Sequence, residues 1–188
     1  MRNNLYFIGI LAPEPVRSET REFQQHIADN YRSKAALKPP PHVTLIPPFL
    51  LAEDKQPVLF KYIEDIAGRQ QTFEVSVDGF NCFGVQVIYA EVEVSDHIKK
   101  LEKDLSSTFY KKFQIERGPS SRFVPHITIA YKDLMPPMFA LAWPEFKDKL
   151  YRRKWMVKEI CLLRSSPGGW EKILGAELGA LKEMELGF

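Results

Sequence analysis

One short motif occurs twice in this chain of 188 residues. Residues 41–45 read Pro-His-Val-Thr-Leu, and residues 125–129 read Pro-His-Ile-Thr-Ile. Both copies have the form Pro-His-aliphatic-Thr-aliphatic, and they lie 84 residues apart. Because the chain holds only 4 histidines, chance is a poor explanation for two such copies. The repeat therefore indicates a duplicated or selected function.

The motif spacing suits acid–base chemistry on a phosphodiester. Residues two apart in a β-strand point to the same face, so His42 projects with Thr44 and His126 with Thr128. In-line attack at phosphorus needs a base for the incoming hydroxyl or water and an acid for the departing oxygen. Imidazoles titrate near neutral pH and can do either, while threonine hydroxyls can donate to the non-bridging oxygens. We predict His42 and His126 as acid and base, in either order, with no cofactor.

Plainer interpretations compete with this one. A lone histidine in a strand is usually a hydrogen-bonded structural residue, but two copies with matched neighbours argue against that. Two histidines could also bind a metal, although no carboxylate or cysteine lies at a helpful position in either copy. We therefore predict no metal site. The other two histidines, His26 and His97, fall in predicted helices and are expected to be ordinary surface residues.

Hydrophobic periodicity predicts an α+β fold with a largely antiparallel sheet. Pro47 and Pro48 are expected to end the second strand, and Ser95 to cap a helix. Residues 135–144 are expected to form a proline-rich connection, 116–122 a polar loop, and 175–188 stay unassigned. Helices are predicted at 16–31, 58–69, 96–113 and, shorter, 145–152; strands are predicted at 5–11, 43–46, 73–77, 85–94, 124–131 and 155–163, with a hairpin partner from Trp170 onward.

The composition does not identify the class of ligand that the protein binds. The net charge of +2 and pI of about 8.4 permit a polyanionic ligand without indicating one. The 2 cysteines are far apart in the sequence and suggest a reducing compartment. The apolar run 5–12 reads as a buried strand rather than a signal peptide, and no segment approaches the roughly 20 apolar residues of a membrane span. We expect a cytoplasmic protein with no membrane association and no obligate protein partner.

The two His-x-Thr motifs resemble those of the 2H phosphoesterase superfamily, which includes 2′-5′ RNA ligase-like proteins and 2′,3′-cyclic phosphodiesterases. Weaker likenesses are the strand 6–11 with its following proline, the segment 80–91, and the strand 160–164 with Ser165 or Ser166. The resemblance implies one domain over 1–188 with two pseudo-symmetric lobes. Each lobe would carry an antiparallel sheet flanked by helices and present one motif to a central cleft.

The resemblance also implies roles for single residues. His42 and His126 would be the acid and base, and Thr44 and Thr128 would bind the phosphate. Some family members place a phosphate-contacting residue soon after the second motif, where Tyr131 stands. Strict alternation would turn Tyr131 away from the site, so its role requires the strand to end or bulge first. Arg122, just before the second motif, is a candidate phosphate contact.

These features predict a metal-independent phosphoesterase that hydrolyses a 2′,3′-cyclic phosphate or a 2′-5′ linkage on an RNA end or cyclic nucleotide, with ligation of RNA ends as the reverse chemistry. One alternative is a binding module for RNA or nucleotides that has lost turnover. Another is a phosphodiesterase for a non-nucleotide substrate, because the sequence does not place the aromatics that would recognise a base. Phe7, Phe49 and Phe83 are the candidates.

Overall fold

A computed structural model describes residues 3–115 and 122–180 of the chain. Its strands form one eight-stranded antiparallel sheet in the order β6-β3-β4-β5-β2-β1-β7-β8. The strands are β1 (Asn3–Leu11), β2 (His42–Ala52), β3 (Phe73–Phe83), β4 (Val87–Val92), β5 (His126–Ala130), β6 (Arg152–Val157), β7 (Glu159–Ser166) and β8 (Gly169–Glu177). The α+β class and the antiparallel sheet are as predicted.

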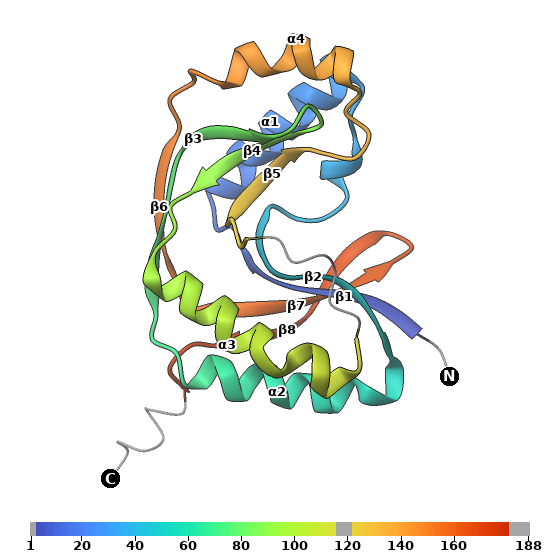
Figure 1. Cartoon of the computed structure of the whole chain (residues 1–188), viewed down its shortest axis with the longest axis vertical. Coiled ribbons are helices and arrows are strands. Elements are labelled where there is room, and N and C mark those ends of the chain that lie inside the picture. The colour runs from blue at the N-terminus through green and yellow to red at the C-terminus, as the bar shows by residue number, and fades with distance from the viewer. Residues whose placement is uncertain (1–2, 116–121, 181–188) are drawn as a thin grey trace.

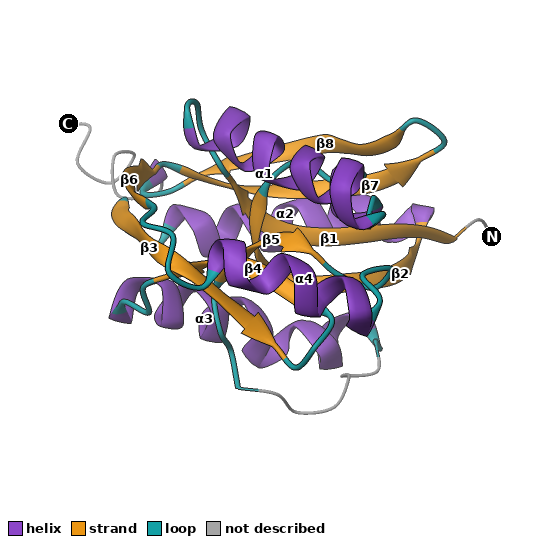
Figure 2. Ribbon diagram, turned by 90° about the horizontal axis from the view of Figure 1, so that it is seen from above, coloured by secondary structure: helices purple, strands orange, loops and turns teal. Residues whose placement is uncertain are grey.

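The sheet has two halves of four strands, which meet where β2 pairs with β5 at Val43 and Ile127. The helices are α1 (Val16–Tyr31), α2 (Gln56–Gly68), α3 (Asp96–Phe113) and α4 (Pro136–Phe146). In Figure 1, α1 and α4 lie over the half that contains β5, and α2 and α3 lie over the half that contains β2. Figure 2 shows α1 and α4 from above. Each half therefore carries one motif strand and one pair of helices, as the resemblance implies.

Two helices have the bounds that the sequence predicts. α1 begins after the Pro13–Pro15 break and ends at Tyr31, before Arg32, whose backbone is left-handed with φ of 60°. α3 begins at the predicted cap, where the Ser95 hydroxyl accepts a hydrogen bond from the Ile98 amide. Their apolar stripes are buried against the sheet, including Ile27 in α1 and Leu101 in α3.

The prediction that Pro47 and Pro48 end a strand is wrong. β2 continues to Ala52, and its register with β1 shifts between the Tyr6–Phe49 pair and the Ile8–Ile46 pair. Two residues of β2 thus stand opposite one residue of β1, which is a β-bulge. Proline has no amide hydrogen to donate, and a bulge does not require one, so both prolines fit inside the strand.

Three other sequence predictions differ from the structure. Residues 136–146 form helix α4, with prolines in its first turn where amide hydrogens have no helical partner. The segment 155–163 is two strands rather than one: β6 pairs with β3 and β7 pairs with β1, in opposite halves of the sheet. The predicted short helix at 145–152 is absent from these described residues, which complete α4 and then lead into β6.

The remaining predictions have mixed outcomes. The hairpin after Ser165 is confirmed as β7 and β8. Most of the predicted polar loop, 116–121, and the end of the tail, 181–188, lie outside the described residues. In the part of the chain that the structure describes, no helix has the length and apolarity needed to cross a membrane.

Candidate active site

The two motifs meet at the centre of the sheet. Val43 of β2 pairs antiparallel with Ile127 of β5, and both side chains are fully buried. Antiparallel pairing about this residue pair directs His42 toward Thr128 and Thr44 toward His126. The two histidines then stand at diagonal corners, where side chains in a regular sheet are about 7–8 Å apart. This arrangement can place one imidazole on each side of a phosphorus atom.

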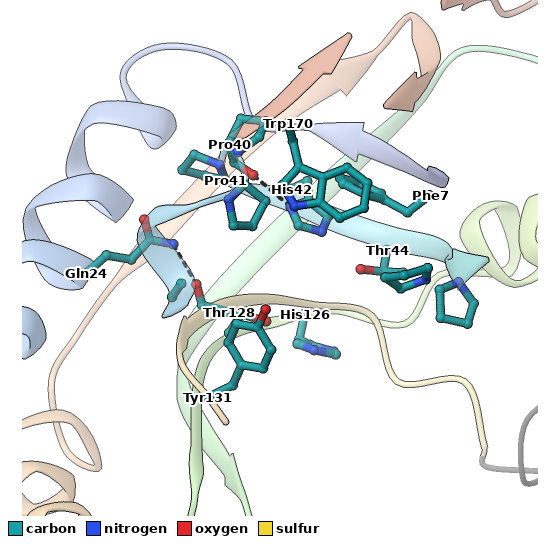
Figure 3. Close-up of a pocket in the computed structure, with 14 residues that line it drawn as sticks. Phe7, Gln24, Pro40, Pro41, His42, Thr44, His126, Thr128, Tyr131 and Trp170 are labelled. Atoms are coloured by element: carbon teal, nitrogen blue, oxygen red, sulfur yellow. Dashed lines mark hydrogen bonds between the residues drawn. The ribbon is translucent and has the colours of Figure 1, made fainter. Parts of the chain in front are cut away.

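All four motif side chains line one cavity of about 300 Å³. Figure 3 shows the cavity with His42 and Thr44 on one strand and His126 and Thr128 on the other. The rest of the lining is largely apolar or aromatic, which is typical of small-molecule sites with a few orienting polar groups. These residues are Phe7, Gln24, Ala36, Pro39, Pro40, Pro41, Pro47, Pro48, Tyr131 and Trp170.

The two imidazoles are held in the same way. Nδ1 of His42 lies 2.7 Å from the Pro40 carbonyl oxygen, and Nδ1 of His126 lies 2.7 Å from the Val124 carbonyl oxygen. A carbonyl can only accept, so each Nδ1 carries a hydrogen and donates it. In the neutral ring, Nε2 then keeps its lone pair and can act as a base; in the protonated ring, Nε2 can act as an acid. Both histidines therefore have the tautomer that general acid–base catalysis at Nε2 requires.

Burial favours the neutral form of both rings. The pKa of His42 falls from 6.5 to about 4, mainly through burial and further through the positive charges of His126 and Arg21, although the Pro40 bond opposes the change. Burial also lowers the pKa of His126. An anionic phosphate between the rings would favour the charged form and raise these pKa values again. A bound anion would therefore favour a protonated imidazole at this site.

Aromatic rings from neighbouring strands pack against each histidine. The Phe7 ring lies 4.4 Å from the His42 ring, and Trp170 meets Phe7 edge-on at 4.7 Å. On the other side, Tyr89 and Phe83 lie 5.0 Å and 5.1 Å from the His126 ring. Packing of this kind restricts the imidazole rotamers and excludes water from their inner faces.

Gly9 explains how β1 can approach His42 so closely. It pairs with Thr44, and a Cβ at this position would lie 2.7 Å from the Val43 carbonyl oxygen and 3.4 Å from Cδ2 of His42. The first distance is shorter than any relaxed contact, so only glycine fits without a backbone shift.

Of the other residues predicted to belong to the site, some line the cavity and some do not. Tyr131 lines the cavity, because the register with β4 shifts between Thr128 and Ala130 and β5 then ends. The bulge interrupts the strict alternation that would have turned Tyr131 away from the site. Arg122 is exposed and lies outside the cavity lining, so its phosphate contact stays a prediction. Of the candidate aromatics, Phe7 lines the cavity, Phe83 packs on His126, and Phe49 is in the core.

Sequence reasoning missed Gln24 and Trp170. Gln24 is 2% exposed on α1, and its Nε2 donates to the Thr128 carbonyl oxygen at 2.8 Å. The only available signal was a glutamine beside the apolar stripe of a helix, which is common on partly buried faces. Trp170 reaches the cavity through the β7–β8 hairpin; the hairpin was predicted, but no sequence pattern linked Trp170 to the two motifs. Within residues 3–115 and 122–180, no three side chains of the metal-binding types gather as a metal site would require.

A family model described as the 2′-5′ RNA ligase superfamily matches residues 12–169, which include both motifs. The chain belongs to this superfamily. It is 30% identical over 144 residues to a Geobacillus kaustophilus protein named "Putative phosphoesterase", covering 76% of this chain and 77% of that one. The curated relatives are matched over 52% to 77% of their own lengths.

Solved structures share the superfamily fold along almost the whole chain. A protein of Thermus thermophilus aligns with a TM-score of 0.71 at 22% identity, covering 93% of this chain and 98% of that one. Escherichia coli LigT complexed with 3′-AMP aligns with a TM-score of 0.71 at 17% identity, covering 94% and 99%. At these identities the likeness establishes the fold.

Proposed function

We propose that this protein is a metal-independent phosphoesterase that hydrolyses a 2′,3′-cyclic phosphate or a 2′-5′ phosphodiester in an RNA end or nucleotide. The observation that carries the proposal is the pairing of the two motifs. Both imidazoles, each fixed through Nδ1, and both threonines line one cavity. The names of curated relatives support phosphoesterase chemistry in general, and the LigT complex with 3′-AMP supports a nucleotide ligand.

The residues can perform both proton transfers of an in-line displacement. Nε2 of one histidine takes a proton from the attacking water, whose oxygen forms a bond to phosphorus. The bond from phosphorus to the ribose oxygen breaks on the opposite side, and that oxygen takes a proton from Nε2 of the other histidine. Thr44 and Thr128 donate to the non-bridging oxygens, where the negative charge resides. If a ribose hydroxyl takes the place of water, its oxygen forms the bond to phosphorus, the same bond to the ribose oxygen of the cyclic phosphate breaks, and the same two proton transfers would join two RNA ends.

Two alternatives fit the same cavity. A binding module would need the pocket and its aromatic walls but no matched pair of Nε2 atoms. A phosphodiesterase for a non-nucleotide substrate would need the histidines but no base-stacking ring. The presence of Phe7, Tyr131 and Trp170 in the cavity lining favours a nucleotide over such a substrate.

The test is turnover of 2′,3′-cyclic nucleotides, a 2′-5′-linked dinucleotide and RNA ending in a cyclic phosphate, in the presence of EDTA. We expect His42→Ala and His126→Ala each to lower kcat by about 10²–10⁴-fold. His97→Ala is the matched control, because His97 stacks on Phe73 and is not part of the cavity lining. Wild-type activity that survives in both active-site variants would place the chemistry elsewhere, and loss of activity in EDTA would refute the metal-free mechanism.

A further inference from the structure

Helix α1 contacts the backbone on both sides of the site. Arg21 donates through one terminal nitrogen to the Leu37 carbonyl oxygen at 2.8 Å and through the other to the Pro39 carbonyl oxygen at 2.9 Å. Both carbonyls belong to the segment that leads directly into His42. That segment also supplies the Pro40 carbonyl that fixes the tautomer of His42. Arg21 therefore fixes the backbone segment whose Pro40 carbonyl oxygen accepts a hydrogen bond from His42.

Gln24, one helical turn further on, reaches the second motif. Its Oε1 accepts from Arg21 at 3.0 Å, so its Nε2 is directed to the Thr128 carbonyl oxygen at 2.8 Å. The orientation of the amide is fixed, because Arg21 can only donate and a carbonyl can only accept. A continuous set of hydrogen bonds thus runs from the segment before His42, through two side chains of α1, to the backbone of Thr128.

We propose that Arg21 and Gln24 are positioning residues. They hold the two motif strands, and with them the two imidazoles, at the separation and orientation that the reaction needs. The proposal rests on the proposed function, and neither residue is assigned a step in the reaction. Strand pairing alone constrains the two motif strands weakly, because in the described residues β2 and β5 share the single pair Val43–Ile127. The polar pair on α1 is a further connection, and Gln24 makes it at the cavity itself. Asp133, after β5, makes another connection to Ser33, Lys34 and Ala35, which are further from His42 in the chain.

Anchoring of α1 alone does not require this pair. Val16, Ile27 and Ala28 of the helix are 4% exposed or less and already attach it to the core. A guanidinium is suited to the task because its planar fork can serve several acceptors at once, which a lysine ammonium on a flexible chain does less well. Arg21 also places a positive charge near His42; the charged or titratable groups that act on this histidine are His126 from β5 and Arg21 from α1.

The experiment compares Arg21→Lys, Arg21→Met and Gln24→Met by two readouts. The first is the kcat and KM on the substrate that the wild type turns over. The second is nitrogen NMR of the imidazoles in the substrate-free protein, which gives the tautomer and pKa of His42 without any activity. Arg17→Met is the matched control: Arg17 lies one turn earlier on α1, is exposed, and donates to the Ala12 carbonyl oxygen at 3.0 Å, outside the motif segments. Thermal unfolding reports whether each variant is folded.

We expect all three variants to lower kcat by roughly 10–100-fold, the cost of a small misplacement of catalytic groups, with KM changed less than about threefold. Arg21→Met should raise the pKa of His42 and mix its tautomers, whereas Arg21→Lys retains the charge and should leave that pKa closer to wild type. Arg17→Met should match wild type in both readouts.

The proposal is overturned if Arg21→Met and Gln24→Met have the kcat of Arg17→Met, or if the His42 tautomer and pKa are the same in Arg21→Met and wild type. If Arg21→Met does not fold, Arg21→Lys and Gln24→Met decide by kcat. If the wild type turns over no substrate, the proposed function fails, and the NMR readout alone decides whether Arg21 positions His42.

Discussion

The low pKa of His42 predicts a specific loss of stability in mild acid. An unfolded histidine has a pKa of about 6.5, whereas His42 in the folded protein has a pKa of about 4. Between these values the unfolded chain binds a proton that the folded protein does not, so acid favours unfolding. Relative to pH 7, this single group should lower the free energy of unfolding by about 2 kcal/mol at pH 5 and about 3 kcal/mol at pH 4.

The assay is urea unfolding at pH 7, 6, 5 and 4 for wild type and His42→Asn. The asparagine amide can still donate to the Pro40 carbonyl that His42 contacts, but it does not titrate. Carboxylates titrate alike in both proteins, so the difference between the two curves isolates His42. We expect wild type to lose about 3 kcal/mol more than the variant on going from pH 7 to pH 4. Parallel curves would show that His42 titrates normally in the folded protein and would refute the electrostatic argument for the site.

Three further predictions concern the pH profile of the reaction, a close backbone approach at Gly9 and the helix cap at Ser95. Because both histidine pKa values are lowered, kcat/KM should be bell-shaped in pH with both limbs below 6.5; a limb above pH 7 would contradict this. Gly9→Ala puts a Cβ 2.7 Å from the Val43 carbonyl oxygen, and urea unfolding and kinetics should show a loss of about 1–3 kcal/mol and a roughly tenfold lower kcat, whereas Gly168→Ala meets nothing within 4 Å and should be neutral. Ser95→Ala removes the cap bond to the Ile98 amide and should cost about 1 kcal/mol with kcat unchanged, whereas exposed Ser107→Ala should cost less.

Helices with clear end signals were predictable from the sequence, and α4, which begins with two prolines, was not. α1 and α3 have apolar stripes bounded by a proline break and by the Ser95 cap, so the pattern and the end signals agree. α4 begins at Pro136 and contains Pro144, and a local pattern cannot distinguish prolines that start a helix from prolines that prevent one. The course of β2 through Pro47 and Pro48 depends on a bulge against β1, and therefore on a partner strand far away in sequence.

The motif residues were predictable because strand alternation alone decides that a histidine and a threonine two residues later share a face. Tyr131 required the bulge between Thr128 and Ala130, which is defined only by the register with β4. Trp170 and Gln24 required the tertiary fold, because each comes from an element with no sequence pattern linking it to either motif. The place of the four motif residues was therefore predictable from the sequence, whereas the places of Gln24 and Trp170 were not.

The motif residues and the residues that position them differ in predictability because of how the two halves of the sheet are joined. Each motif is rigid by itself, since its aliphatic residues are buried and its histidine is tied to a carbonyl two residues earlier. Acid–base catalysis on one phosphorus atom also needs the two imidazoles at a fixed separation. Across the described residues the sheet contributes one pair of residues to that separation, and the α1 hydrogen bonds of Arg21 and Gln24 join the two motif segments beside the cavity. Asp133, which follows β5, adds hydrogen bonds to Ser33, Lys34 and Ala35, further from the two motifs. If the proposed function holds, changes that leave both motifs intact but alter this junction should therefore lower kcat without removing either histidine.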